Sequence, residues 1–159
     1  MNFTTKLRFF YIAALFLLLI TSCDKEKYDV VPDEYVDFNI DLSDNEFSVL
    51  NAIGNFVYIS SSTNNWGRSA AGYDNNGIIV YSSNLDEYYA YDRTCPHDYA
   101  ENGISIQVDV DFTLAVCPEC GTTYALTAGG TPASGVGRYP LKNYKTSFDG
   151  RFIHVWNYR

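Results

Sequence analysis

The sequence predicts an all-β fold. Two stretches, 35–42 and 104–112, alternate strictly between apolar and polar residues, which is the period of a half-buried strand. Aromatic residues make up 16% of the chain, with 14 tyrosines among them, and aromatic rings suit the pleated, half-buried surfaces of sheets. No stretch shows a helical period of useful length, and no strand-helix alternation predicts a parallel sheet. We therefore expect antiparallel strands throughout.

The expected strands can be placed by their patterns and by the turn residues between them. Ser43 to Glu46 has the spacing of a capping box and allows one short helical turn, and 60–76 reads as a loop in which Trp66 folds over one end of the sheet. Residues 129–137 read as an irregular glycine-rich loop, and Asp149-Gly150 predicts a type I′ hairpin. The expected strands are 35–42, 56–59, 78–81, 87–92, 104–112, 113–116, 122–126, 139–144 and 152–156.

The N-terminus has the pattern of an export signal. Basic residues at Lys6 and Arg8 precede an apolar run from Phe9 to Ile20, which is too short for a spanning helix. The following Ile20-Thr21-Ser22-Cys23 resembles the lipobox of bacterial lipoproteins, which implies that Cys23 is lipidated after removal of residues 1–22. An ordinary signal peptide with a chance cysteine is the alternative.

The predicted organisation is a signal peptide at 1–22, a lipidated cysteine with a flexible tether at 23–32, and one domain at 33–159. The charged stretch 24–27 resembles the segment that accompanies surface export in bacteria of the Bacteroides type. We expect an exported lipoprotein of the cell envelope, anchored to the outer membrane or the cell surface rather than the inner membrane.

The charge of the chain argues against nucleic-acid binding. The formal net charge is −8, and removing residues 1–22 takes away two of the 11 basic side chains and none of the 19 acidic ones. Such a surface repels phosphate backbones, and no cluster of lysines or arginines offsets it locally.

Two short pairs of potential metal ligands lie at turns between expected strands. Cys95-Pro96-His97 follows the strand 87–92, and Cys117-Pro118-Glu119-Cys120 follows the strand 113–116. Three thiols and one imidazole brought together by two loops suit either a tetrahedral zinc ion or the two irons of a [2Fe-2S] cluster.

These motifs and their flanks resemble the Rieske iron-sulfur domain over most of the region from Tyr35 onward. The resemblance lies in Asp92-Arg93-Thr94-Cys95-Pro96-His97, in Cys117-Pro118-Glu119-Cys120-Gly121-Thr122-Thr123-Tyr124, and in the later loop Gly135-Val136-Gly137-Arg138-Tyr139-Pro140-Leu141. It implies an antiparallel β-sandwich with a small inserted cluster-binding β-subdomain. It also implies a [2Fe-2S] cluster and one-electron transfer with a redox partner protein that the sequence does not name.

The chain departs from the Rieske pattern at one ligand. The resemblance implies that Cys95 and Cys117 hold the inner iron and that His97 and Cys120 hold the outer one, where the family has a second histidine in place of Cys120. A thiolate there should lower the reduction potential, because the two imidazoles of a Rieske centre are what raise it. Thr122 and Tyr124 occupy the positions of side chains that donate hydrogen bonds toward the sulfurs. Val136 stands where the family's cover loop has proline.

Zinc and a disulfide remain alternatives to the cluster. If Cys23 carries lipid, three cysteines are left, so one disulfide would strand a free thiol, whereas three thiolates with His97 complete a Zn(Cys3His) site. The export signal has no twin-arginine pair, which counts against export in a cluster-loaded state. With either a zinc ion or a disulfide at this site, the chain would be a non-redox structural or interaction domain.

The histidine count bears on catalysis. The chain contains only His97 and His154, so a mononuclear iron held by two histidines and a carboxylate is not available once His97 is a ligand. We expect His154 to serve in packing or in a hydrogen bond. The sequence therefore favours an electron-transfer module over a complete oxygenase.

Overall fold

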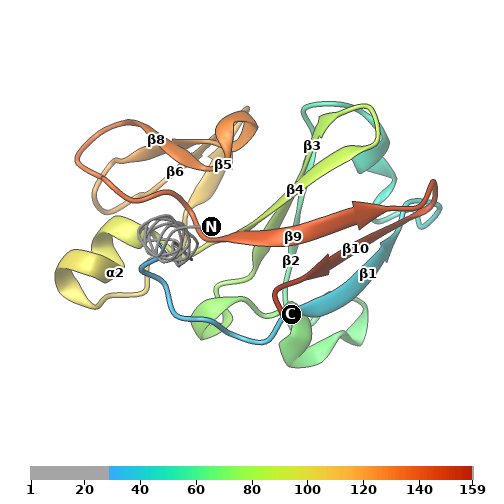
Figure 1. Ribbon diagram of the computed structural model, residues 1–159, viewed down its shortest axis with the longest axis horizontal. Coiled ribbons are helices and arrows are strands. Elements are labelled where there is room, and N and C mark those ends of the chain that lie inside the picture. The colour runs from blue at the N-terminus through green and yellow to red at the C-terminus, as the bar shows by residue number, and fades with distance from the viewer. Residues whose placement is uncertain (1–28, 159) are drawn as a thin grey trace, which may run out of the picture.

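The computed structural model describes residues 29–158 and consists mostly of antiparallel strands. The larger sheet has six strands in the order β1-β10-β9-β4-β3-β2 (Figure 1). They span Asp37–Asp41 (β1), Phe56–Ile59 (β2), Ile78–Asn84 (β3), Glu87–Asp92 (β4), Asn143–Phe148 (β9) and Phe152–Trp156 (β10). The earliest of these strands pairs with the last, and Ile40 lies opposite Ile153. The predicted all-β, antiparallel fold class is confirmed.

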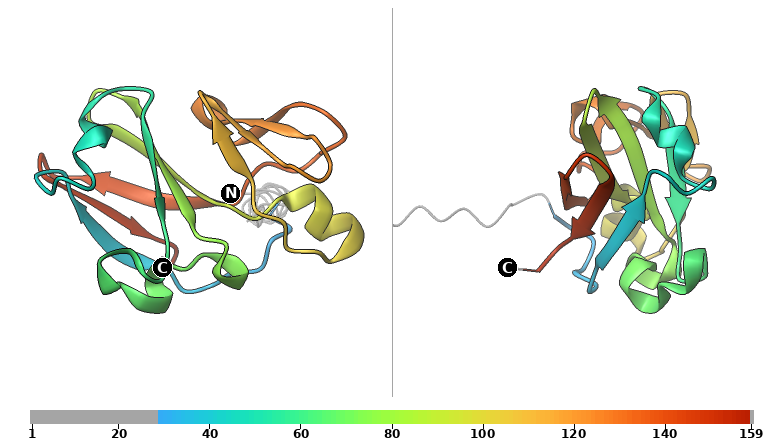
Figure 2. Two further views of the ribbon diagram at one scale, coloured as in Figure 1. Left: turned by 180° about the vertical axis from the view of Figure 1, so that it is seen from behind. Right: turned by 90° about the vertical axis from the view of Figure 1, so that its right-hand side faces the viewer.

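A second, smaller sheet is inserted between β4 and β9. Its strands lie in sequence order and span Asp109–Asp111 (β5), Leu114–Val116 (β6), Thr123–Ala125 (β7) and Thr131–Ser134 (β8). Although this whole segment separates β4 from β9, those two strands pair directly, with Ala90 opposite Tyr144. The small sheet stands beside the large one in both of the views that show it broadly (Figures 1 and 2). The predicted small inserted subdomain is confirmed.

The larger sheet curls around the main hydrophobic core. Phe38 and Ile40 of β1 share this core with Ile59 of β2 and Val155 of β10, although β1 and β2 are the two edges of the sheet. Trp66 packs against it from the loop after β2, with its ring centroid 5.3 Å from that of Phe38. The two halves of the sheet therefore face one another across the core, as in the predicted sandwich.

A second hydrophobic core joins the large sheet to the small one. Strand β3 is buried on both faces, so Ile79 and Tyr81 point into this second core while their neighbours point into the first. Tyr124 of β7 and the thiols of Cys95 and Cys117 belong to the same cluster. Two of the predicted ligands are thus part of the packing that holds the inserted subdomain in place.

One helix, α2 (Pro96–Asn102), replaces the loop that we expected after Cys95. Its ends carry ordinary helix signals: Pro96 occupies the first turn, where its missing N–H costs nothing, and Gly103 ends the helix in the left-handed conformation with φ of 67°. The sequence analysis placed a loop here and missed the helix, although both of these signals were present in the sequence.

Several element boundaries also differ from the expectations. Strand β9 begins after Pro140 and Leu141 rather than at 139, since proline has no N–H and the Leu141 N–H donates to the Gly130 carbonyl instead. Strand β8 lies inside the predicted irregular loop. The hairpin at Asp149-Gly150 is present, but only its glycine has a positive φ (100°), so the turn is not type I′. Five short 3-10 helices complete the described elements, at Ser48–Asn51, Thr63–Asn65, Gly67–Ala70, Tyr73–Asn75 and Leu126–Ala128.

The segment before β1 lies against the domain and is held by a buried lysine. The Lys142 side chain is only 3% exposed, and its ammonium group lies 2.5 Å from Asp29 and 2.7 Å from Asp33. It also donates to the Val31 carbonyl, and Val31 itself is 2% exposed. Residues 29–32, which we assigned to the tether, are thus attached to the fold. The predicted signal peptide, the lipidated Cys23 and residues 24–28 lie outside the described residues. Within residues 29–158 no helix is long and apolar enough to cross a membrane.

Candidate metal centre

The first ligand-bearing loop leaves the end of β4 and is tied to the segment before β5. The Cys95 N–H donates to the Ile106 carbonyl at 2.7 Å, and the Val108 N–H donates to the Arg93 carbonyl at 2.7 Å. These bonds use the backbone of 104–108, which is why that stretch is not a full strand as its alternation predicted. They fix Cys95 at the point where helix α2 begins.

The second ligand-bearing loop is a tight turn between β6 and β7. The Cys117 N–H donates to the Thr122 carbonyl at 2.9 Å, and the Gly121 N–H donates back to the Cys117 carbonyl at 3.0 Å. Gly121 has φ of 68°, a conformation that favours glycine, so the turn can reverse the chain within a few residues. Cys117 is buried, while Cys120 at the tip of the turn is half-buried.

The two loops bring four potential metal donors together. The ligand atoms of Cys95, Asp98, Cys117 and Cys120 all lie within 4.8 Å of one another. The three predicted cysteines are therefore assembled, and all three are free thiols. His97 is half-buried and is not a member of this group, whereas Asp98, which our sequence analysis did not single out, is. The signal for Asp98 was its place in the first turn of the unexpected helix.

Short contacts connect the donors to each other. The sulfurs of Cys95 and Cys120 are 3.7 Å apart. The Cys117 thiol donates to the Asp98 carboxylate at 2.9 Å, and the Tyr124 hydroxyl lies 3.2 Å from the Cys95 sulfur.

Both side chains that we expected beside the sulfurs, Thr122 and Tyr124, lie there with their hydroxyl groups next to a sulfur atom. Tyr124 is buried against Cys95, and the Thr122 hydroxyl lies 3.3 Å from the Cys120 sulfur. Thr122 in turn accepts a hydrogen bond of 3.0 Å from the Gly137 N–H of the later loop. That loop packs closely, since a Cβ on Gly137 would lie 2.6 Å from a Thr122 methyl carbon. Val136 is 60% exposed on its outer side.

Burial and neighbouring groups shift the ionisation of the donors. Burial raises the pKa of Cys95 to about 11, and burial together with the Asp98 carboxylate raises the pKa of Cys117 above its usual range. Burial alone would also raise the pKa of Asp98, but hydrogen bonds from the thiols of Cys117, Cys95 and Cys120 outweigh it and hold that pKa below its usual range. Metal binding must therefore displace thiol protons in this site.

One donor separation matches the edge of a tetrahedral site around a single ion. Zinc–sulfur bonds of about 2.3 Å at tetrahedral angles place two sulfurs about 3.8 Å apart, and the Cys95–Cys120 separation is 3.7 Å. A binuclear cluster with Cys95 and Cys120 on different irons needs these two sulfurs farther apart than 3.7 Å, because ligands of different irons stand farther apart than ligands of the same iron. Three thiols favour zinc or iron over magnesium or calcium.

The predicted packing or hydrogen-bonding role of His154 is what the structure shows. Its Nε2 lies 2.8 Å from the Asp37 carboxylate, and its ring stacks on Trp156 with centroids 4.5 Å apart. These residues belong to β1 and β10 of the large sheet, so His154 is engaged outside the donor group.

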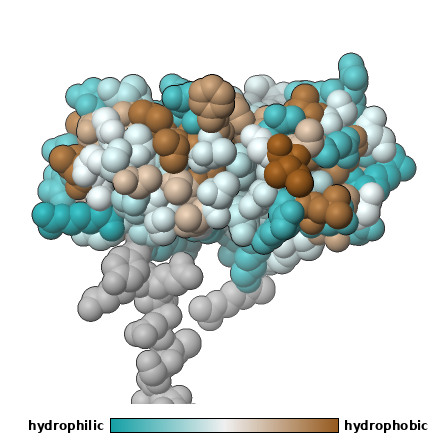
Figure 3. Space-filling view, turned by 90° about the horizontal axis from the view of Figure 1, so that it is seen from above, coloured by the Kyte–Doolittle hydropathy of each residue, from teal (hydrophilic) through white to brown (hydrophobic). Residues whose placement is uncertain are grey.

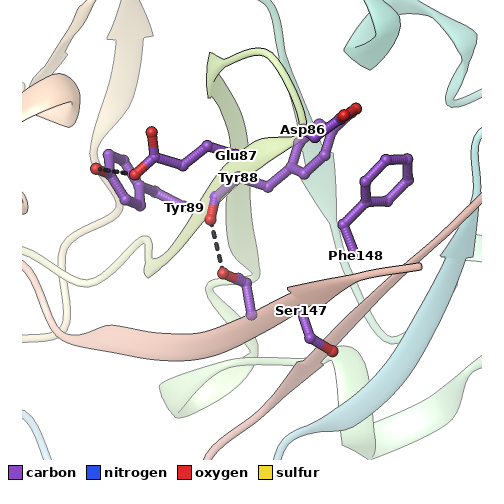
Figure 4. Close-up of a pocket in the computed structure, with 7 residues that line it drawn as sticks. Asp86, Glu87, Tyr88, Tyr89, Ser147 and Phe148 are labelled. Carbon is purple, nitrogen blue, oxygen red and sulfur yellow. Dashed lines mark hydrogen bonds between the residues drawn. The ribbon is translucent and has the colours of Figure 1, made fainter. Parts of the chain in front are cut away.

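A small pocket of about 200 Å³ lies at the opposite end of β4 from the donor group. Tyr88, Tyr89 and Phe148 line it together with the carboxylates of Asp86 and Glu87 (Figure 4). The Tyr89 hydroxyl already donates to Glu87 at 2.9 Å. Seen from above the small sheet, apolar side chains form small separate groups rather than one broad patch (Figure 3). We assign no binding or catalytic role to the pocket or to these apolar groups.

Comparisons with known proteins gave structural neighbours only. No protein-family model matches the chain, and no curated protein matches it. The ferredoxin of carbazole 1,9a-dioxygenase from Nocardioides aromaticivorans IC177 is 16% identical with a TM-score of 0.46, over 77% of this chain and 97% of that one. A chain from the complex of reduced oxygenase and oxidized ferredoxin in carbazole 1,9a-dioxygenase is 20% identical with a TM-score of 0.43, over 65% and 82%. The Sphingomonas yanoikuyae B1 ferredoxin is 20% identical with a TM-score of 0.38, over 52% and 76%.

Proposed function

We propose that this chain is a membrane-anchored, one-electron transfer module whose redox centre is an iron–thiolate site at Cys95, Cys117 and Cys120. The observation that carries the proposal is the meeting of two loops that place three free thiols around one point. Two of the thiols are fully buried, and hydroxyl groups lie beside two of the sulfurs. Hydrogen bonds to thiolate ligands and burial are the protein's means of setting the potential of such a centre.

The finer form of the proposal is the [2Fe-2S] cluster that the Rieske resemblance implies. In that form His97 and Cys120 hold the outer iron, and the loop carrying Cys120 must move away from Cys95 for the cluster to enter. Such a centre, held by these residues, would supply one-electron transfer to a partner protein. With three thiolates among its ligands, its potential should lie below that of centres with two histidines, and Cys120→His should raise it.

Metal analysis tests this function most directly. The chain from Asp24 onward would be purified without oxygen and its iron, zinc and acid-labile sulfide measured per chain, together with visible absorption and electron paramagnetic resonance spectra after dithionite reduction. We expect iron, a coloured oxidised form and a paramagnetic signal in one redox state. A colourless protein with stoichiometric zinc would contradict the electron-transfer proposal.

The anchor is tested separately from the centre. We propose that lipid on Cys23 holds the domain to the cell envelope, at the outer membrane or the cell surface. Metabolic labelling with a radioactive fatty acid should label the wild-type protein and not Cys23→Ala, which should appear in the soluble fraction. Labelling of both proteins would contradict lipidation at Cys23, whatever metal the domain holds.

A second candidate is a non-redox domain stapled by zinc. The observation that favours it is the 3.7 Å sulfur separation, which matches the edge of a zinc tetrahedron. In this case removing the metal should lower the free energy of unfolding by several kcal/mol, and no reduction by dithionite should occur. Because zinc has one stable oxidation state, the spectra described above separate the two functions.

A further inference from the structure

We infer that Asp98, and not His97, supplies the fourth donor, so that the site is a Cys3Asp set built for a single tetrahedral ion. This inference rests on the proposed metal-binding function and adds the ligand, the number of metal ions and the charge of the site. It begins from the donor positions. The ligand atoms of Asp98 and the three cysteines all lie within 4.8 Å of one another, and His97 is outside the group.

Asp98 is a buried carboxylate with the surroundings of a metal ligand. Asp98 is 4% exposed, yet no lysine, arginine or histidine within residues 29–158 forms a salt bridge with it. Among the described residues, its side chain accepts hydrogen bonds from thiols only, the Cys117 thiol lying at 2.9 Å, and thiols are weak donors. A buried carboxylate is costly unless it is paired with a cation, coordinates a metal or accepts strong hydrogen bonds.

Another buried carboxylate in the same region shows the contrast. Asp92 is fully buried and also lacks an ionic partner among the described residues, but it accepts from the N–H groups of Tyr73 and Thr94 and from the Tyr144 hydroxyl, at 2.6 to 2.8 Å. Three strong donors satisfy Asp92 within the fold. Asp98 has no comparable set in the described part of the chain, and a metal ion held with the three thiolates would complete it.

The geometry of α2 decides between the two neighbouring residues. Successive side chains on a helix point about 100° apart, so His97 and Asp98 cannot face the same point equally well. The rotation of the helix is fixed one residue later, where Tyr99 packs edge-on against Tyr73 at 5.2 Å and its hydroxyl lies 3.3 Å from that of Tyr73. With the helix held in this rotation, Asp98 and not His97 lies among the thiols.

The donor set defines the class of ion. Three thiolates and one carboxylate suit a borderline divalent ion such as Fe²⁺ or Zn²⁺, whereas Mg²⁺ and Ca²⁺ prefer oxygen donors. A carboxylate in place of a neutral imidazole adds one negative charge to the site. An iron ion held in this set would therefore be stabilised in its oxidised state more than in a Cys3His set.

The experiment combines composition with metal affinity. Wild type, Asp98→Ala, Asp98→Asn and His97→Ala would be analysed for metal and sulfide as purified. The metal-free proteins would then be titrated anaerobically with Fe²⁺, Zn²⁺ or Co²⁺ against a chromogenic chelator, with Co²⁺ absorption reporting tetrahedral thiolate ligation. Glu101→Gln is the matched control, because it removes one negative charge from the exposed face of the same helix. Far-ultraviolet circular dichroism checks that each variant is folded.

We expect one metal ion per chain, little sulfide, and a loss of affinity of at least about 100-fold in Asp98→Ala, since even outer-shell changes cost 10- to 100-fold. Asp98→Asn keeps the shape of the side chain and should also weaken binding, while His97→Ala and Glu101→Gln should bind as wild type does. If Asp98→Ala is unfolded, the Asp98→Asn and His97→Ala titrations still decide the ligand.

Other outcomes separate this inference from the proposed function. Two irons and two sulfides per chain, lost in His97→Ala and kept in Asp98→Asn, would overturn the Cys3Asp site and leave the electron-transfer module standing. One zinc ion per chain that depends on Asp98 would support the site and count against electron transfer. A chain that binds none of the three ions would contradict both.

Discussion

Replacing Lys142 should lower the free energy of unfolding by less than replacing its two carboxylate partners. Lys142→Met removes the charge that holds the segment 29–33 against the domain, and Asp29→Ala with Asp33→Ala removes the opposite charges. The Lys142 side chain is 3% exposed, whereas those of Asp29 and Asp33 are 35% and 84% exposed. The two substitutions therefore leave very different groups without a partner.

The loss in free energy of unfolding depends on which charged group is left without a partner. In Lys142→Met both carboxylates remain in contact with water, so the loss is that of hydrogen bonds to charged groups, about 1–2 kcal/mol. In the double aspartate variant an ammonium group stays buried without a counter-charge, and the cost of such a group is about 3–5 kcal/mol. We expect a difference of about 2 kcal/mol, or roughly 30-fold in the folding equilibrium.

Urea denaturation of the chain from Asp24 onward, followed by tryptophan fluorescence, would measure both free energies of unfolding. Lys145→Met is the matched control, because Lys145 is an exposed lysine on β9 and should change stability by less than about 0.5 kcal/mol. Equal destabilisation by the two charge removals, or a larger effect of Lys142→Met, would refute the buried ion pair.

Three further predictions concern single side chains. Hydrogen bonds from Arg151 lower the pKa of Asp41 from 3.8 to about 2. This pair therefore stabilises the fold above about pH 4, and the stabilisation is lost as the pH falls toward 2. The difference in urea midpoint between wild type and Asp41→Asn should shrink over that pH range. Gly137→Ala should destabilise the domain by about 1–3 kcal/mol in thermal unfolding, because the added Cβ would lie 2.6 Å from Thr122. An unchanged melting temperature would mean that the loop packs differently. Tyr124→Phe removes a hydroxyl that stabilises negative charge on the buried Cys95 sulfur. In the iron-loaded protein this substitution should lower the reduction potential, measured by redox titration, by about 20–60 mV. A rise in the potential would contradict the contact between Tyr124 and Cys95.

The strands of this fold were readable from the sequence because their patterns are local. The alternation at 35–42 and the short apolar runs that follow Gly54 and Gly77 correspond to β1, β2 and β3. What could not be read was which backbone groups would pair across long separations. The stretch 104–108 alternates like a strand, but its carbonyl and N–H groups bond to Arg93 and Cys95 and not to a neighbouring strand of the small sheet.

The meeting of the thiols was predictable from the sequence, and the presence of Asp98 rather than His97 among them was not. Two short cysteine motifs at strand ends predicted that Cys95, Cys117 and Cys120 would meet, and they do. Which of the two side chains faces the thiols depends on the rotation of α2, and α2 packs through Tyr99 against the distant Tyr73. Motif spacing carries no information about that contact.

The direct pairing of β4 with β9 places the two ends of the inserted segment side by side in the large sheet. The Asp92 N–H donates to the Lys142 carbonyl at 2.9 Å, so the chain leaves the large sheet and re-enters it at adjacent positions. A short loop can join such neighbouring ends at a small entropic cost. The inserted segment can thus vary in length without changing the pairing of the large sheet, as long as it still covers Ile79 and Tyr81 on the outer face of β3.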